Sequence, residues 1–357
     1  MAAFREGRVI ETLEERPDLV RVRVVLASGE VEAVGFPAML GPVAPGDRIV
    51  VNTTGLELSL GTGGIGFILW NLDGGGERGP GAGHIVKLRY TPWQTEVLAV
   101  EAPESDHHEQ LMEACSLGGA PVVACCLHSQ APAAAAGIKA AAEGARVALL
   151  VTDGAALPLA WSRLVRRSKE AGLVDVTCTA GHAFGGDLEA VNVFSGLAAL
   201  RTVANADAIV VAMGPGGVGT GTALGFTAIE QGQVLDAATA LGGKPVAALR
   251  ISFVDRRERH RGVSHHSLTA LTLAARERCT VALPVLAEPR GAQVRQQLTA
   301  GGLDERHDVV EADGAPGVDL MTARGVMPSS MGRRLDDTPE VFLAAAAAGA
   351  LAATHLL

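Results

Sequence analysis

Residues 208–222 read AIVVAMGPGGVGTGT, an uncharged apolar run that ends in a loop containing five glycines. Apolar runs of this kind are typical of strands in a parallel sheet that is buried on both faces. Strands of this type are predicted at 121–127, 146–151, 174–179, 208–213, 245–251 and 280–285. Helices are predicted between and after them, at 131–143, 155–171, 188–203, 222–241, 264–278 and 292–300. The alternation predicts a doubly wound, mostly parallel α/β domain.

The first hundred residues follow a different pattern, with short valine-rich runs separated by turn residues. Strands are predicted at 8–13, 20–26, 30–36, 48–52, 66–72, 85–89 and 96–99. Short strands at this spacing favour a small β-barrel or sandwich. We therefore expect a β-rich domain over residues 1–100 and the α/β domain over residues 101–357.

Composition excludes several classes of function. The chain has 357 residues, a net charge of -9 and only 3% aromatic residues, which disfavours nucleic acid as a partner. The apolar stretch 208–229 is interrupted by glycine and proline, and 342–357 is shorter than the ~20 residues of a membrane span, so we expect a packed final helix. Five cysteines without a CxxC pair, and no visible signal peptide, indicate a cytoplasmic protein. Whether it forms a homo-oligomer stays open.

The loops that leave the predicted strands differ in chemistry from those that enter them. The entering loops, such as Gly118-Gly119-Ala120, are short and carry few functional groups, whereas the exit loops contain histidines, acids, hydroxyls and glycines. Open α/β sheets bind ligands at the carboxyl ends of their strands. The sequence therefore predicts a ligand site along that edge of the sheet.

The glycine loop 214–222 is the main candidate for binding an anion. Glycines let backbone N–H groups approach an anion, and a helix that begins after the loop would add a favourable dipole. A structural turn is the alternative, and NAD is disfavoured because the next predicted strand runs to Arg250-Ile251-Ser252 without an acid. The charged run 255–261 is either a solvated loop or a source of arginines that contact the same anion. The candidate substrate-binding residues are Ser129, Thr152, Gly214, Gly216, Gly217, Gly219, Thr220, Thr222, Arg256, Arg259 and Arg261.

Histidines and acids in the exit loops are the candidate catalytic groups, because both residue types transfer protons in enzymes. The candidates are His128, Asp153, Asp187, His260 and His265. Asp153 has an alternative role as a helix cap. A divalent metal is a second interpretation, since histidine and carboxylate groups from several strand ends can share one ion. Its candidate ligands are His182, Asp187, Glu189, His265 and His266, but no compact motif decides between metal, acid–base and structural roles.

Several strings resemble an uncharacterised bacterial family that is classed as a domain of unknown function. They are TTGLELSLGTGG at 53–64, LHSQ at 127–130, TDGAALP at 152–158, AFGGDLEAV at 183–191, GPGGVGTGT at 214–222 and RERHRGVSHHS at 257–267. The resemblance spans most of the chain and implies a soluble bacterial protein. It carries over no activity, substrate or catalytic residue.

Two hypotheses about function follow from these observations. The first is a cytoplasmic hydrolase or group transferase acting on a small phosphate- or carboxylate-bearing substrate. The second is a regulatory protein that binds a small ligand or nucleotide at the same place without turnover. An enzyme needs its Asp and His groups intact, whereas a binder tolerates Asp153→Asn but loses affinity when an arginine is removed.

Overall fold

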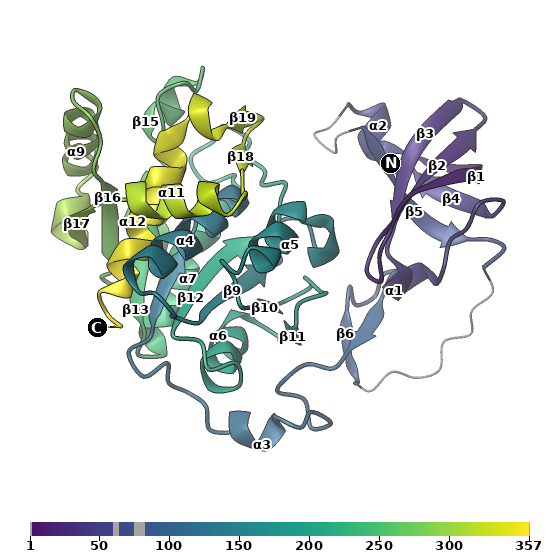
Figure 1. Ribbon diagram of the computed structural model, residues 1–357, viewed down its shortest axis with the longest axis horizontal. Helices are drawn as coiled ribbons and strands as arrows, with labels where there is room; N and C mark the ends of the chain where they lie inside the picture. Colours follow the sequence, from purple (N-terminus) through teal and green to yellow (C-terminus); the bar gives the residue numbers. More distant parts are fainter. Residues whose placement is uncertain (1, 60–63, 75–82, 357) are drawn as a thin grey trace. The chain divides into compact units, whose positions relative to one another are not determined.

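The computed structural model describes residues 2–59, 64–74 and 83–356. The described residues form two compact units. The first contains residues 2–59, 64–74 and 88–95, and the second contains residues 83–87 and 96–356. Figure 1 shows a strand-rich and a mixed α/β unit, as the sequence predicts.

The first unit is a closed barrel with the strand order β1-β2-β3-β5-β4. Along β2 every second residue, from Val20 to Leu26, points into the core, so the alternating sequence directly produces one buried face. Neighbouring strands are antiparallel except for β3 and β5, which are parallel. The elements are β1 (Phe4–Glu15), β2 (Val20–Leu26), β3 (Gly29–Gly35), α1 (Pro37–Leu40), β4 (Arg48–Asn52), α2 (Thr54–Glu57) and β5 (Ile65–Asn71).

The second unit is built on an eight-stranded sheet with the order β11-β10-β9-β12-β8-β13-β16-β17, in which every neighbouring pair is parallel. The predicted parallel α/β class is confirmed. The strands are β8 (Pro121–Ala124), β9 (Val147–Thr152), β10 (Val176–Thr179), β11 (Leu188–Glu189), β12 (Ala208–Met213), β13 (Lys244–Ala248), β16 (Thr280–Pro284) and β17 (Asp308–Ala312). The small two-stranded sheets are β6 (Ile85–Lys87) with β7 (Thr95–Val97), β14 (Ile251–Ser252) with β15 (Gly262–Val263), and β18 (Ser329–Ser330) with β19 (Arg333–Arg334).

Alternate residues of the central strands enter two separate cores, one on each face of the sheet. On β12, Ile209 and Val211 belong to the core that contains residues of α6, α7, α9 and α10, whereas Ala208 and Val210 belong to the core with α4, α5, α11 and α12. This explains why the strands read as continuous apolar runs. The helices are α3 (His108–Leu111), α4 (Ala131–Ala141), α5 (Arg163–Glu170), α6 (Val193–Thr202), α7 (Glu230–Ala240), α8 (His265–Thr269), α9 (Arg290–Ala300), α10 (Leu303–Arg306), α11 (Ala315–Ala323) and α12 (Pro339–Ala353).

Three predicted helices begin later than expected, because strand or loop pairing replaces their first turns. In the segment predicted as helix from residue 188, residues 188–189 pair with β10 as β11, and α6 begins at Val193. The segment predicted as helix from residue 155 instead exchanges backbone hydrogen bonds with the 181–187 loop, at Leu157 and Leu159 on one side and Phe184 on the other. The segment predicted as helix from residue 222 folds back so that Gly219 pairs with Phe226, and α7 begins only at Glu230. The glycine loop therefore does not open a helix.

The connections that leave the neighbouring strands β9 and β12 run in opposite directions along the sheet. These strands are neighbours, yet the chain leaves β9 towards β10 on one side and leaves β12 towards β13 on the other. In open α/β sheets a ligand-binding crevice forms where adjacent connections diverge in this way. No helix in the part of the chain that the structure describes has the length and apolar character required to cross a membrane.

Helices α4, α11 and α12 approach closely through glycines, and Figure 1 shows α11 and α12 beside α4. A methyl group added at Gly349 of α12 would lie 2.0 Å from the carbonyl oxygen of Ala134 in α4. We expect Gly349→Ala to lower the free energy of unfolding of the α/β unit by about 2 kcal/mol, since backbone atoms of two packed helices must separate. Urea denaturation followed by circular dichroism measures the change. The neighbouring, half-buried Ala350→Ser should change stability by less than ~0.5 kcal/mol; equal effects of both variants would contradict this account.

Candidate functional site

The exit loops of the central strands form one continuous series of contacts along the carboxyl edge of the sheet. His128, after β8, has Nδ1 2.8 Å from the carbonyl oxygen of Met213, the last residue of β12. Ala156, after β9, donates its N–H to the carbonyl of Pro215 in the glycine loop at 3.0 Å. The structure thus brings the loops 127–130, 152–158 and 214–222 together, as expected from their places in the sequence.

Three histidines, His260, His265 and His266, form the densest group of ionisable side chains at this edge, and we call them the histidine trio. Their ring centroids lie 4.4–4.9 Å apart. His260 and His266 are buried and His265 is half-buried. Phe226, which follows the glycine loop, stacks on His266 with a centroid distance of 4.0 Å and so holds that ring in place.

Three arginines surround the buried carboxylate of Asp255, beside the trio. It is 2% exposed and accepts hydrogen bonds from Nε and Nη2 of Arg257 at 3.0 and 2.9 Å. Arg250 and Arg333 each lie 3.6 Å from the same carboxylate. Hydrogen bonding to Arg257 holds the pKa of Asp255 well below its usual range. One buried carboxylate thus faces three guanidinium groups, which leaves a local excess of positive charge.

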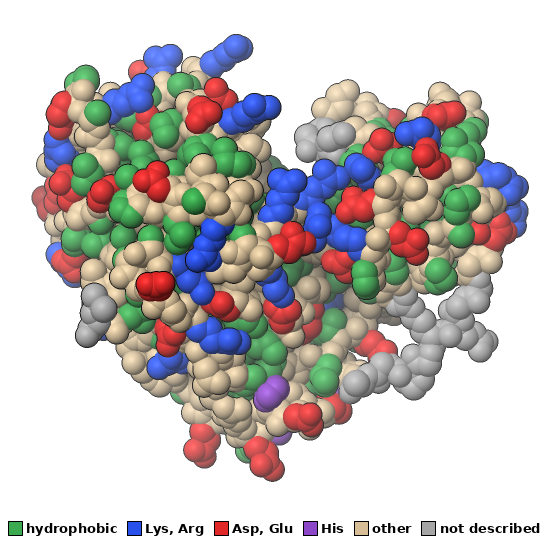
Figure 2. Space-filling view, viewed as in Figure 1, with side chains coloured by type: hydrophobic (Ala, Val, Ile, Leu, Met, Phe, Trp, Pro, Cys, Tyr) green, Lys and Arg blue, Asp and Glu red, His purple; other side chains and the backbone are tan. Residues whose placement is uncertain are grey.

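This positive charge is local rather than a property of the whole surface. The protein has a net charge of -9, and Figure 2 shows acidic and basic side chains interspersed over the visible face of the α/β unit. Burial, together with the arginines, lowers the pKa values of the histidine trio. Burial and then Arg250 lower the pKa of both His260 and His266 to about 3, and burial and then Arg259 lower the pKa of His265. Near neutral pH the trio is therefore uncharged and lies in a positive field.

The contact between Arg250 and His266 fixes where the proton of His266 lies. Nη1 of Arg250 is 3.2 Å from Nδ1 of His266, and a guanidinium can only donate hydrogen bonds. Nδ1 of His266 must therefore accept, so the neutral ring carries its hydrogen on Nε2. That nitrogen is a hydrogen-bond donor and has no lone pair for a metal.

The spacing of the trio is compatible with a metal ion, but the charges around it are not favourable to one. One ring nitrogen from each histidine can be chosen so that all lie within 4.8 Å of one another, and two nitrogens that share a Zn²⁺ at ~2.1 Å lie at most ~4.2 Å apart. The proton on Nε2 of His266 and the neighbouring guanidinium groups oppose a cation. These charges favour an anion over a metal at this position.

The glycine loop lies against the trio and its arginines. A methyl group added at Gly219 would lie 3.3 Å from Cε1 of His266, and one added at Gly221 would lie 3.3 Å from Nη2 of Arg259. Among the described residues, the N–H groups of Gly217, Gly219 and Gly221 have no hydrogen-bond acceptor. These glycines are exposed, so their N–H groups are available to a ligand. Nε2 of His265 is buried and has no partner among the described residues. The free N–H groups are donors of the kind that bind anions in glycine-rich loops.

Thr220 and Thr222 close the glycine loop instead of facing a ligand. Their hydroxyl oxygens are 2.9 Å apart, Thr220 Oγ1 donates to the carbonyl of Gly225, and Thr222 Oγ1 accepts the N–H of Gly225. The loop therefore keeps its shape without an anion. Its free donors are backbone N–H groups, whereas the sequence also suggested these hydroxyls.

Thr152 and Asp153 lie on the β9 side of the edge, with a partner that the sequence did not suggest. Oγ1 of buried Thr152 donates to Oε1 of Glu230 at 2.7 Å, and burial together with nearby Asp153 raises the pKa of Glu230. Asp153 accepts the N–H of His182 at 2.9 Å. Glu230 was hidden in the interior of a predicted helix; in the structure it is the first residue of α7.

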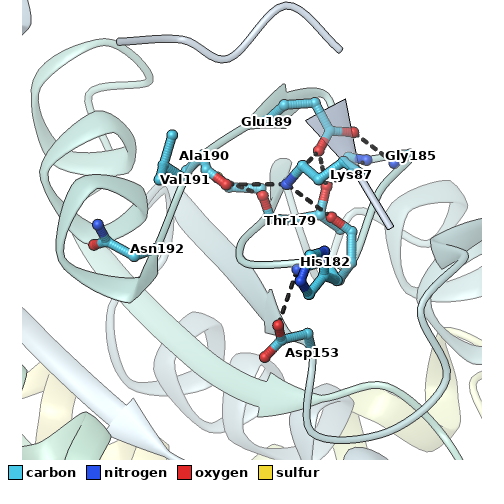
Figure 3. A network of polar contacts seen from close by, with 12 residues as sticks. Lys87, Asp153, Thr179, His182, Gly185, Glu189, Ala190, Val191 and Asn192 are labelled. Carbon is cyan, nitrogen blue, oxygen red and sulfur yellow. Dashed lines mark hydrogen bonds and ion pairs between the residues drawn. The ribbon is translucent and has the colours of Figure 1, made fainter. Parts of the chain in front are cut away.

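Glu189 belongs to a separate buried network around Lys87, shown in Figure 3. Lys87 is 1% exposed and donates to the carbonyl oxygens of Ala183 and Ala190, each at 3.0 Å, and its Nζ lies 3.3 Å from Glu189. Glu189 also accepts hydrogen bonds from Thr179 and Gly185. Every donor of the ammonium group is occupied, so this network is structural in character.

The remaining predicted residues make no hydrogen bond or ion pair with the trio in the described part of the chain. Asp187 is bound by the N–H and hydroxyl of Thr177 and by Lys169, near the start of β10. Nε of Arg261 donates to the carbonyl of Asp255 at 3.3 Å. Within residues 2–59, 64–74 and 83–356, no hydrogen bond or ion pair joins Ser129 or exposed Arg256 to the trio.

Comparison with known proteins places the chain in a family. Residues 32–349 match the model of the family described as Protein of unknown function (DUF3866), so the chain belongs to that family. No curated protein and no solved structure matches it.

The network around Lys87 predicts how a substitution at this lysine changes the stability of the fold. We expect Lys87→Met to lower the free energy of unfolding by about 3 kcal/mol, because it leaves Glu189 buried without its cation. Adding Glu189→Gln to this variant should restore part of the loss. Thermal denaturation of the two single variants and the double variant measures the differences. If the double variant loses as much stability as the two single variants together, the two groups do not interact.

The arginines around Asp255 predict a pH dependence of stability. Because its pKa is lowered on folding, Asp255 stabilises the fold above the pKa of an unfolded aspartate, ~3.9, and this contribution is lost as the pH falls through the folded-state value. Asp255→Asn should therefore lower the free energy of unfolding by about 3 kcal/mol at pH 7, with a smaller difference from the wild type below pH ~4. Urea titrations at several pH values test this. Exposed Asp319→Asn is the control and should have little effect at any pH.

Proposed function

We propose that this DUF3866 protein is an enzyme, a hydrolase or group transferase, that binds a small phosphate- or carboxylate-bearing substrate between the glycine loop and the histidine trio. One observation carries the proposal: the glycine loop, with unpaired N–H groups at Gly217, Gly219 and Gly221, contacts uncharged His266 at Gly219 and Arg259 at Gly221. Backbone N–H groups and guanidinium groups are the donors that proteins use for phosphate and carboxylate oxygens.

The donors differ in kind, and together they favour an anion over a neutral ligand. Arg259 and Arg257 supply charge, the loop supplies N–H groups, and Nε2–H of His266 supplies a neutral donor held in place by Arg250 and Phe226. A neutral donor costs less to bury than a charged one. Since His266 keeps a fixed proton near neutral pH, it serves as a binding group and not as a proton carrier.

His265 is the member of the trio that suits proton transfer. Nε2 of His265 has no partner among the described residues, and burial and Arg259 lower its pKa. It can therefore accept a proton from a substrate hydroxyl or a water molecule near neutral pH. His260 is bound to Ser264, with Nδ1 2.7 Å from the hydroxyl oxygen of that serine. It would therefore position the neighbouring ring of His265 and would not itself react.

Location and partners complete the proposal. All five cysteines are free, and Cys125, Cys126, Cys178 and Cys279 are buried, which fits a reducing cytoplasm. The net charge of -9 supports a small-molecule ligand over nucleic acid.

Sulfate is a suitable first probe because it mimics a phosphate dianion and keeps its charge between pH 5.5 and 7.5. Isothermal titration calorimetry should show binding, with an affinity that changes little over this range because His266 stays neutral. Arg259→Gln should weaken binding by about 10-fold or more, as expected for loss of one charge-assisted hydrogen bond. Exposed Arg306→Gln on α10 is the matched control. No detectable binding of sulfate, phosphate or small carboxylates to the wild type would overturn the proposal.

Turnover is tested separately from binding. With a panel of phosphate and carboxylate esters, the wild type should turn over at least one substrate, and His265→Gln should lower that rate while sulfate affinity stays within about threefold of the wild type. If the wild type binds these anions but turns over none of the panel, and His265→Gln leaves anion binding unchanged, the protein would instead be the regulatory binder.

A further inference from the structure

A serine that the sequence did not single out lies against His128. Ser162 ends the short helical turn Leu159–Trp161 and is the N-cap of α5. Its hydroxyl oxygen is 2.6 Å from Nε2 of His128, on the loop that follows β8. Ser162 is 4% exposed and His128 is half-buried. The pair is thus held by two separate exit loops at the same edge of the sheet as the glycine loop.

The hydrogen bonds of His128 fix the direction of the contact. Nδ1 lies 2.8 Å from the carbonyl oxygen of Met213, which can only accept, so Nδ1 carries the hydrogen. Nε2 of the neutral ring then has a free lone pair, and it accepts the hydrogen bond from the hydroxyl of Ser162. Burial lowers the pKa of His128, which keeps this neutral form populated near neutral pH.

A second serine–histidine contact shows what is special about this one. Ser264 also caps a helix, and its hydroxyl is 2.7 Å from Nδ1 of His260. No third group fixes the tautomer of His260 in the described part of the chain, and Ser264 is fully buried. Only the Ser162 contact combines a hydroxyl, a base and a group that orients the base, which is the arrangement that activates a nucleophile.

We propose that Ser162 is a nucleophile activated by His128, and that the substrate of the proposed enzyme is a small carboxylic ester with an anionic group held by the glycine loop. Oγ of Ser162 attacks the ester carbonyl carbon while its proton passes to Nε2 of His128. The carbon–oxygen bond to the alcohol then breaks, and the alcohol leaves with the proton from His128. Water gives a proton to His128 and attacks the acyl carbon; the bond from that carbon to Oγ then breaks, the carboxylic acid leaves, and His128 returns the proton to Oγ, which restores Ser162.

The glycine loop connects this pair with the anion site. The loop begins directly after Met213, whose carbonyl orients His128, and reaches His266 at Gly219. The proposal rests on the proposed function for the choice of substrate, but the reactivity of Ser162 itself does not depend on anion binding. The two can therefore fail separately.

The capping role of Ser162 has to be separated from a catalytic one. Its hydroxyl oxygen accepts the N–H of Val165 at 3.1 Å, so Ser162→Ala removes a cap as well as a nucleophile. Ser162→Asn keeps a capping oxygen but has no hydroxyl to react. His128→Gln keeps a donor for the Met213 carbonyl but provides no base. Ser195→Ala, which alters an exposed hydrogen bond at the N-cap of α6, is the control.

The test is covalent labelling of the full-length protein by an alkyl fluorophosphonate, which forms an Oγ–P bond and releases fluoride, followed by peptide mass spectrometry. Since Ser162 is nearly buried, we expect slow labelling, over hours, located at Ser162. Ser162→Asn should abolish it and His128→Gln should slow it at least 10-fold, with unchanged circular dichroism, whereas Ser195→Ala should label as the wild type does. The labelling rate should fall at acid pH with a midpoint below ~6.5, the ordinary pKa of histidine.

Three results would overturn the proposal. They are no labelling of folded wild-type protein within a day, labelling of Ser264 in place of Ser162, or labelling that is unchanged by His128→Gln. Sulfate titration of the same samples distinguishes this failure from failure of the proposed function, because an unreactive Ser162 with normal sulfate binding leaves the anion site intact.

Discussion

The candidate site depends on one buried carboxylate. Asp255 accepts hydrogen bonds from Arg257 and faces Arg250 and Arg333, so three guanidinium groups are held within reach of a single acid. A buried charge of this kind is tolerated only where its partners are fixed. The fixed position of Arg250 then decides the tautomer of His266, and burial together with the surplus positive charge keeps the trio neutral. These constraints support the proposal that the site binds an anion.

Parallel topology explains why such distant residues meet. Every strand of the eight-stranded sheet points the same way, so loops leaving β8, β9, β12 and β13 emerge at one edge. The chain after β13 then folds back as β14 and β15, which returns residues 252–263 over that edge. Nε2 of His265 is buried without a partner among the described residues. A buried polar group without a partner costs about 1–3 kcal/mol, and such a departure is expected where a protein binds a ligand.

The sequence predicts the architecture well because its strongest signal is burial. Strands such as β12 are buried and apolar on both faces, and β12 lies between Asp207 and Gly214, so both its type and its ends are recognisable. β17 was missed because it lies at the sheet edge, with largely exposed residues and no apolar run. The late starts of α5 and α7 were missed because loop-to-loop pairing, which joins Phe184 to Leu157 and Gly219 to Phe226, leaves no local pattern. The same limit applies to Ser162 and Glu230, whose partners lie 34 and 78 residues away.

The two parts of the edge differ in what holds them, and this bears on how they would act together. His128 is oriented by the last residue of β12, so its position is set by the register of the sheet and not by a loop. The glycine loop is held by its own hydrogen bonds, by the hydrogen bond from Ala156 to Pro215 and by contact with His266 and Arg259, and its residues from 217 to 224 are exposed. In the proposed enzyme the loop would bind the anionic group while the sheet holds the base, so that each is positioned by a different element.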